Sequence, residues 1–253
     1  MIFPVDRGDR APEGVVRVRA PNPSPLTLEG TNTYVVKGWV VDPGPDDAGH
    51  LDRVLDTVPT GHGDRRLMGI VLTHDHPDHS GGAEELARRI GGAPVVLPRG
   101  GDRAGPFEAI ATPGHTPDHV CLLYGRTLFT GDTVLGEGSV FITPGEGSLA
   151  AYLDSLRRLL ALELDVLCPG HGPFVSSPRE RIEELLEHRL DRERRLEEAL
   201  AAGARTGEDM LDAAWPEVPA TLRPAAALTL EAHLEKLSEE DRLPEGVERR
   251  SGV

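Results

Sequence analysis

The fold is decided by the stretch Thr73-His74-Asp75-His76-Pro77-Asp78-His79-Ser80-Gly81-Gly82. It follows the apolar run 70–72, which predicts a short buried strand. Three imidazoles and a carboxylate lie within six residues: His74, His76, Asp78 and His79. These groups are ligands for zinc and related divalent metals. An extended loop would send alternate side chains toward two adjacent centres, so the stretch predicts a metal site at a strand end.

Three further stretches repeat the order of strand, glycine turn, and histidine or aspartate. They place His115 after strand 109–111, Asp132 after strand 128–129, and His171 after strand 166–168. A ligand on a loop at a strand end is held by a rigid scaffold and stays reachable. Taken singly, these turns are weak signals, because Gly-Asp-Thr and Gly-His-Gly are common in turns.

The remaining histidines and the two cysteines need separate interpretations. His119, four residues after His115, is interpreted as a partner of the ligands, as a proton relay or as a structural loop residue. The cysteines end or lie in apolar strands, which indicates buried structural thiols at Cys121 and Cys168. Four histidines lack neighbouring ligands: His50, His62, His188 and His233.

Short strands and helices alternate over the first part of the chain. The predicted strands are 15–19, 34–36, 39–41, 70–72, 95–97, 109–111, 120–123, 128–129 and 166–168. The predicted helices are 48–58, 83–90 and 149–162. This mixture favours an α/β domain whose sheets are covered by helices.

The pattern changes near residue 178. Residues 178–202 form a long charged pattern with an apolar stripe, and Ser177-Pro178 is a helix start signal. Two more helices are predicted at 208–214 and 225–237. We therefore expect two domains, a catalytic domain over 1–178 and a helical domain over 179–253.

Composition limits the class of protein. The 253 residues carry a net charge of −15, and both predicted domains are acidic, which disfavours a basic nucleic-acid module. No apolar run approaches the ~20 residues that span a membrane. Two cysteines rule out a disulfide framework, and residues 1–7 lack the pattern of a secretory signal. We expect a cytoplasmic protein without a membrane partner.

The ordered set of ligands resembles the metallo-β-lactamase superfamily, whose pattern is His-x-His-x-Asp-His followed by a distant His, Asp and His. Every position of that pattern is filled here. The resemblance implies an αββα sandwich of two sheets with helices outside. It also implies two divalent metal ions. Zn²⁺ is the first candidate, and iron or manganese could occupy the same ligands. One would be held by His74, His76 and His115, the other by Asp78, His79 and His171, with Asp132 bridging.

Departures that mark other branches are missing. A zinc β-lactamase with a Cys ligand would carry it at Asp132, and a di-iron flavoprotein would have an acidic residue at His76. The resemblance therefore favours a hydrolase with a full dinuclear site. Two metals generate a bridging hydroxide and polarise the electrophile. Asp78 would orient that hydroxide, and we expect catalytic roles for Asp78, Asp132 and His119.

The stretches 22–34, 129–138 and 169–173, and the C-terminal helices, resemble the β-lactamase-like protein 2 family, which includes a zinc-dependent endoribonuclease. This resemblance implies a small winged-helix-like C-terminal domain and single-stranded RNA as the most concrete substrate. The acidic balance weighs against RNA, since single-strand binders use cationic grooves. Four arginines cluster on the long helix, but interleaved glutamates favour a salt-bridged face: Arg189, Arg192, Arg194 and Arg195.

Two alternatives stay open. The first is a thioester or ester hydrolase of the glyoxalase II type, acting on a small acyl substrate. His171-Gly172-Pro173 differs from the Gly-His-Glu-Tyr pattern of glutathione-binding glyoxalases, which argues against glutathione thioesters only. The second is a non-catalytic metal-binding protein on a hydrolase scaffold, which the intact ligand set disfavours.

Overall fold

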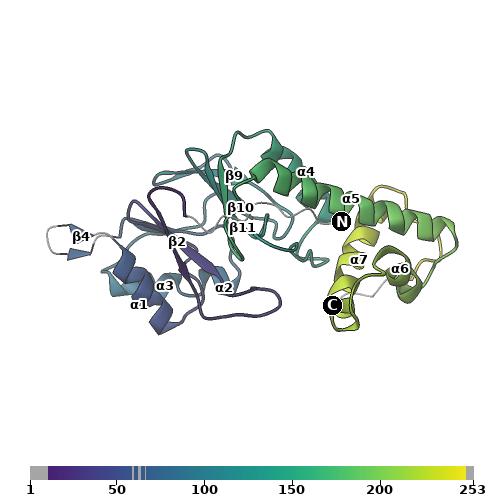
Figure 1. The fold of residues 1–253 in the computed structure, drawn as a ribbon, viewed down its shortest axis with the longest axis horizontal. Helices are drawn as coiled ribbons and strands as arrows, with labels where there is room; N and C mark the ends of the chain where they lie inside the picture. Colours follow the sequence, from purple (N-terminus) through teal and green to yellow (C-terminus); the bar gives the residue numbers. More distant parts are fainter. Residues whose placement is uncertain (1–10, 59, 62–63, 66, 249–253) are drawn as a thin grey trace. The chain divides into compact units, whose positions relative to one another are not determined.

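The computed structural model describes residues 11–58, 60–61, 64–65 and 67–248 (Figure 1). Its chain divides into two compact units. The first comprises residues 1–112, 118–140 and 162–181, and the second residues 113–117, 141–161 and 182–253. The predictions for residues 1–7 and for His62 lie outside the described residues.

The first unit contains two five-stranded sheets. One has the order β1-β2-β3-β6-β7 and mixes antiparallel and parallel pairs. Its strands are β1 (Val15–Arg19), β2 (Asn32–Val36), β3 (Trp39–Val41), β6 (Gly69–Val71) and β7 (Val95–Val96). Pairing of Val36 with Trp39 across Lys37-Gly38 joins the predicted strands 34–36 and 39–41 in a hairpin.

The other sheet has the order β12-β11-β10-β9-β8, with one parallel pair, β11 with β12. Its strands are β8 (Arg103–Ala104), β9 (Phe107–Ala111), β10 (Val120–Tyr124), β11 (Thr127–Gly131) and β12 (Val166–Pro169). A separate two-stranded ribbon joins β4 (Thr60–Gly61) to β5 (Asp64–Arg65). The sequence patterns did not predict β4, β5 or β8.

Side chains of both sheets meet in one buried core, so the sheets are packed face to face. The core contains Tyr34, Val36 and Val71 from the first sheet and Phe107, Leu122 and Phe129 from the second. The Tyr34 and Phe129 rings pack edge to face, with centroids 5.2 Å apart. Each buried apolar side chain of this size stabilises the fold by about 1.5–3 kcal/mol.

Helices cover the other face of the first sheet (Figure 1). α1 (Ala48–Thr57) turns Leu51 and Val54 onto that face, and α3 (Ala83–Arg89) contributes Leu86. Asp47 begins α1 by accepting a hydrogen bond from the backbone N–H of His50 at 2.7 Å.

One expected loop is partly helical. Residues 77–80 form the short helix α2 (Pro77–Ser80), where an extended loop was predicted. Proline at the first helical position lacks only an N–H that would be unpaired anyway, and its fixed φ suits the helix. The prediction of an extended stretch with alternating side chains was therefore wrong after His76.

The second unit consists mainly of helices. It contains α4 (Leu149–Leu160), most of α5 (Pro178–Ala201), α6 (Gly207–Ala214), the short 3₁₀ helix η1 (Ala220–Leu222) and α7 (Arg223–Glu239). Helices α5, α6 and α7 share an apolar core around Leu196, Met210 and Leu234. Among the described residues, every helix is too short or too polar to traverse a bilayer.

Loop 113–117 belongs with α4 for a local reason. The Ser148 N–H donates to Gly114 O at 2.8 Å, and Ser155 Oγ donates to Pro113 O at 2.7 Å. Gly114, at φ +148°, lies so close to Tyr152 that a Cβ there would be 2.4 Å from the Tyr152 Cα. The units are therefore discontinuous in sequence, and a domain division at residue 178 stays a prediction.

Candidate metal centre

The predicted ligands lie in segments that follow four strands, with Asp78 and His79 in the short helix α2. His74, His76, Asp78 and His79 follow β6, His115 follows β9, Asp132 follows β11, and His171 follows β12. The backbone of β12 is tied to that of β11, because the Gly170 N–H donates to Gly131 O at 2.9 Å. The sheet thereby brings Asp132 and His171 together, although 39 residues separate them in the sequence.

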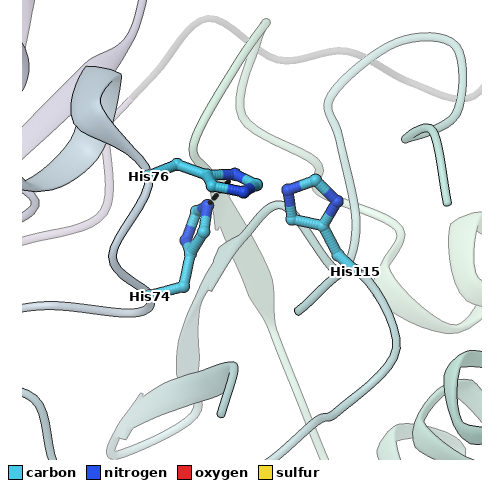
Figure 2. Close-up of side chains that lie close together, drawn as sticks. All are labelled: His74, His76 and His115. Carbon is cyan, nitrogen blue, oxygen red and sulfur yellow. Dashed lines mark hydrogen bonds between the residues drawn. The ribbon is translucent and has the colours of Figure 1, made fainter. Parts of the chain in front are cut away.

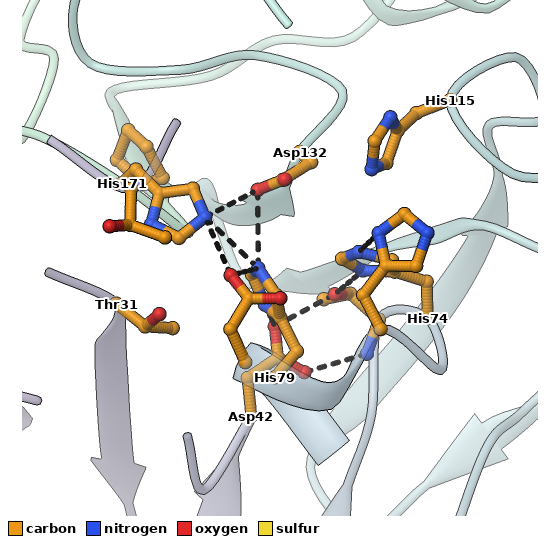
Figure 3. Close-up of polar contacts among 12 residues, drawn as sticks. Thr31, Asp42, His74, His79, His115, Asp132 and His171 are labelled. Atoms are coloured by element: carbon orange, nitrogen blue, oxygen red, sulfur yellow. Dashed lines mark hydrogen bonds and ion pairs between the residues drawn. The ribbon is translucent and has the colours of Figure 1, made fainter. Parts of the chain in front are cut away.

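Four donor atoms converge in the first unit (Figure 3). His79 Nε2 lies 3.2 Å from His171 Nε2, 3.3 Å from Asp132 Oδ1 and 3.6 Å from Asp78 Oδ2. His171 Nε2 lies 3.3 Å from Asp78 Oδ2 and 3.4 Å from Asp132 Oδ1. His79 and His171 are fully buried or nearly so.

These separations suit one metal ion. Zinc binds histidine nitrogen and carboxylate oxygen at about 2.0–2.2 Å, so tetrahedral ligand atoms lie about 3.3–3.5 Å apart. The five measured distances fall around that value. Two imidazole nitrogens facing each other beside two carboxylates also match the donors that zinc and iron accept. The residues present therefore fit a divalent ion.

A second group gathers His74, His76 and His115 (Figure 2). One nitrogen of each ring lies within 4.8 Å of the others, and His74 Nε2 lies 3.1 Å from His76 Nδ1. His115 Nδ1 lies 3.0 Å from the carbonyl oxygen of Phe141, which can only accept, so Nδ1 carries the proton. The other nitrogen of His115 therefore keeps its lone pair for a ligand bond.

His74, His79 and Asp132 form a third group with donor atoms within 4.8 Å. Asp132 thus lies near His74, which belongs to the group with His76 and His115, and near His79, which belongs to the group with Asp78 and His171. The structure brings together all seven residues predicted as ligands, in three overlapping groups.

Asp42 orients His79, a role that the sequence pattern did not predict. Asp42 follows β3 at φ +48°, is buried, and lies with Oδ2 2.9 Å from His79 Nδ1. It also accepts from the Thr73 N–H at 2.8 Å and from Thr73 Oγ1 at 2.7 Å. A proton shared with Asp42 at Nδ1 leaves His79 Nε2 as the metal-facing atom. The only signal was an aspartate at a strand end, within a Pro-Gly turn.

Residues of β2 hold the loop that carries His171. Asn32 Nδ2 donates to Pro169 O at 3.0 Å and to Gly172 O at 2.8 Å. The Asn32 N–H donates to Gly170 O at 2.7 Å, and Tyr34 Oη donates to Pro169 O at 2.7 Å. Asn32 and Tyr34 lie in a stretch that carried the family resemblance, but spacing gave no reason to assign them this role.

Charges in the first group are strongly coupled. Burial favours neutral His79, but Asp132 and Asp42 outweigh it and raise the His79 pKa well above its usual value. Burial would raise the pKa of Asp132, yet His171 and His79 hold that pKa well below its ordinary range. Asp132 and Asp78 raise the pKa of His171 to about 9, against the effect of burial. The cluster therefore stabilises ionised carboxylates beside positive charge.

Three of the other histidines lie outside the candidate metal centre. His50, His188 and His233 are in α1, α5 and α7, outside the candidate ligand groups found among the described residues. Both cysteines are free and buried, as expected. His119 is buried beside Asp132, with its Nε2 3.1 Å from the Asp132 backbone nitrogen.

Family comparisons agree with this geometry. Residues 26–106 and 94–171 match the family described as the metallo-beta-lactamase superfamily. Residues 206–246 match the beta-lactamase associated winged helix domain. The expected fold class, an α/β metallo-β-lactamase fold with a winged-helix C-terminal domain, is confirmed.

Individual relatives span most of the chain. The Drosophila melanogaster protein named Beta-lactamase-like protein 2 homolog is 30% identical, over 92% of this chain and 91% of its own. The Aspergillus fumigatus protein named Atrochrysone carboxyl ACP thioesterase is 30% identical, over 81% of this chain and 75% of its own. A metallo-beta-lactamase family protein from Thermus thermophilus has a TM-score of 0.69 at 25% identity, covering 90% of this chain and 94% of its own.

Proposed function

The chain belongs to the metallo-beta-lactamase superfamily, whose members are generally hydrolases, and from that premise we propose that it hydrolyses a small acyl thioester or ester with two bound metal ions. The superfamily commonly binds zinc or iron. Zinc is our first candidate, and iron or manganese would suit the same donors.

The observation that carries the proposal is the convergence of His79, His171, Asp78 and Asp132 at 3.2–3.6 Å. In our assignment Asp78, His79 and His171 hold one ion. The other is held by His74, His76 and His115, and Asp132 lies between the two. When bound, the ions would lower the pKa of water and polarise the scissile carbonyl.

The chain's own residues would orient the reactants. The Asp78 side chain is 30% exposed, against 10% for Asp132, so Asp78 is the carboxylate that can reach a substrate or an attacking water. Asp42 keeps the His79 ring in place through Nδ1. The protein supplies no cysteine nucleophile for this reaction, since both thiols are buried.

The substrate class rests on charge and on relatives. The net charge of −15 would repel a polyanion such as RNA. Among the arginines of α5, Arg194 and Arg195 form ion pairs with Asp191, and Arg189 and Arg192 are buried. These four arginines are therefore buried or paired with an acidic residue, and they do not supply the exposed cationic track that the RNA hypothesis needs. A relative named as an ACP thioesterase supports an acyl substrate.

A substrate panel tests the proposal. Zinc-loaded protein is assayed on acyl-CoA thioesters of increasing chain length, on aryl esters and on a labelled single-stranded RNA, each with and without a chelator. We expect chelator-sensitive cleavage of at least one acyl substrate and none by Asp132→Ala. Cleavage of RNA only would replace the acyl proposal with the endoribonuclease. Two bound metals with no cleavage at all would favour a non-catalytic binding protein.

A further inference from the structure

His119 is surrounded by groups that fix it in one orientation. It precedes β10, is 1% exposed, and its ring is packed against that of His74 with centroids 4.9 Å apart. We propose that His119 is a positioning residue, which holds Asp132 by accepting a hydrogen bond from the Asp132 backbone N–H. His119 itself transfers no proton in the reaction. The inference rests on the proposed function, because Asp132 is the residue we assign to both metals.

The backbone of Asp132 determines the protonation of His119. The Asp132 nitrogen is 3.1 Å from His119 Nε2, and a backbone N–H can only donate. His119 Nε2 must therefore be an unprotonated acceptor, and the proton of the neutral ring lies on Nδ1.

The groups around Nδ1 agree with that tautomer. Nδ1 lies 3.0 Å from Thr112 Oγ1 and 3.1 Å from Thr133 Oγ1. The Thr112 hydroxyl donates to Cys121 Sγ at 3.4 Å, so its oxygen is available to accept from Nδ1–H. The hydrogen bonds therefore point in one direction. The Asp132 N–H donates to His119 Nε2, and His119 Nδ1–H donates to Thr112 Oγ1.

The backbone next to Asp132 is shaped for this contact. Gly131 has φ +46°, and a Cβ there would lie 2.4 Å from Thr73 Oγ1 and 2.7 Å from His119 Nε2. The Gly131 carbonyl accepts from the Gly170 N–H at 2.9 Å. Asp132 is thus held from β10 through His119 and from β12 through Gly131, and a side chain at residue 131 would separate these contacts.

A proton relay needs a nitrogen that can exchange its proton with water or substrate. His119 uses Nε2 for the Asp132 N–H and Nδ1 for two threonine hydroxyls, and it is shielded from solvent. Of the roles open from the sequence, the structure favours positioning over proton transfer.

Two substitutions distinguish the role of Nε2 from that of Nδ1 in His119. His119→Gln can place its amide oxygen near the position of Nε2 and accept from Asp132, whereas His119→Asn reaches only the position of Nδ1. We expect His119→Asn to weaken zinc binding about 10–100-fold, and His119→Gln to recover most of that loss. Zinc affinity is measured by competition with a chromophoric chelator, and Co²⁺ spectra report the ligand environment. His188→Asn, on the exposed surface of α5, is the matched control.

Histidine ¹⁵N NMR of the wild-type protein tests the tautomer without a variant, with His119 assigned from the spectrum of His119→Gln. We expect a protonated Nδ1 and a bare Nε2. A protonated Nε2, or unchanged zinc affinity and Co²⁺ spectra in His119→Asn, would overturn the inference while leaving the proposed function intact. Failure of the wild-type protein to bind two metals would instead refute the proposed function.

Discussion

In the part of the chain that the structure describes, each unit buries a cluster of charged side chains, and these clusters differ in how their charge is balanced. In the helical unit, Glu193 Oε1 lies 2.9 Å from Lys236 Nζ and 2.9 Å from Arg242 Nη1. In the α/β unit, the carboxylates of Asp78 and Asp132 lie 3.3–3.6 Å from imidazole nitrogens that also face each other.

The difference separates a structural cluster from one that can take a ligand. Lys236 and Arg242 balance the charge of Glu193 with permanent cations, so that carboxylate needs no bound ion for neutrality. Around His79 and His171, lone-pair donors converge at distances suited to one ion, and only protons supply positive charge there. Burial of charge alone would not have distinguished the two.

Asp132→Ala should have the largest effect, because it removes the residue we assign to both ions. We expect the bound metal to fall from two equivalents to at most one, and hydrolysis to fall by more than about 100-fold, the upper range for outer partners of a ligand. Elemental analysis of the dialysed protein measures the first effect and the acyl assay the second. Glu193→Gln is the control from the helical unit. A similar metal loss in that variant would contradict the distinction between a structural cluster and a metal-binding cluster.

Asp42→Asn tests the support of a ligand without removing it. An amide at residue 42 keeps the size but loses the charge that holds His79 Nδ1–H. Metal affinity should therefore fall by about 10–100-fold. Chelator competition measures the change, and Asp46→Asn, an exposed neighbour, provides the reference. Equal affinities in the two variants would show that Asp42 serves only the fold.

Asn32→Ala should affect stability more than chemistry. It removes the two side-chain hydrogen bonds to Pro169 O and Gly172 O, each worth about 0.5–1.5 kcal/mol. We expect the free energy of unfolding to fall by about 1–3 kcal/mol, together with weaker metal binding through His171. Urea titration of the metal-free and zinc-loaded forms measures both. A loss of stability with unchanged metal affinity would show that Asn32 of β2 does not contribute to metal binding.

Glu193→Gln should give the smallest effect, and one that depends on pH. Burial would raise the pKa of Glu193, but His233 and Lys236 hold it at about 2, below the ordinary 4.5. A depressed carboxyl pKa adds stability above pH 4.5, which is lost as the pH falls toward 2. The wild-type advantage over Glu193→Gln should therefore be greatest at neutral pH and shrink in acid.

Trp215, in the core of the helical unit, reports unfolding of that unit by fluorescence once Trp39 is replaced by Phe. The Trp39→Phe and Trp39→Phe/Glu193→Gln chains are compared from neutral pH to about pH 3. A difference that stays constant with pH would contradict the assigned ionisation of Glu193.

Much of the fold and most of the candidate site could be predicted from the sequence. The strands around Ile70, Leu122 and Leu167 are apolar runs ending in turns, and local pattern is sufficient to find them. The seven candidate ligands were found because histidine and aspartate after a strand are few and chemically specific.

Long-range contacts account for what was missed. Asp42 lies in an ordinary Asp-Pro-Gly turn, and only the folded chain brings it to His79, 37 residues away. Asn32 contacts residues about 140 positions later. Likewise, no local signal associates Gly114 with Tyr152 and the helical unit, because a glycine needed for close approach has the same sequence signature as one in any turn.

Zinc-edge anomalous diffraction from crystals of the zinc-loaded protein tests whether two metal ions bind where the candidate ligands converge. We expect two anomalous peaks, one bound by His79, His171 and Asp78 and the other by His74, His76 and His115, with Asp132 contacting both. A single peak, or zinc bound away from these residues, would contradict it.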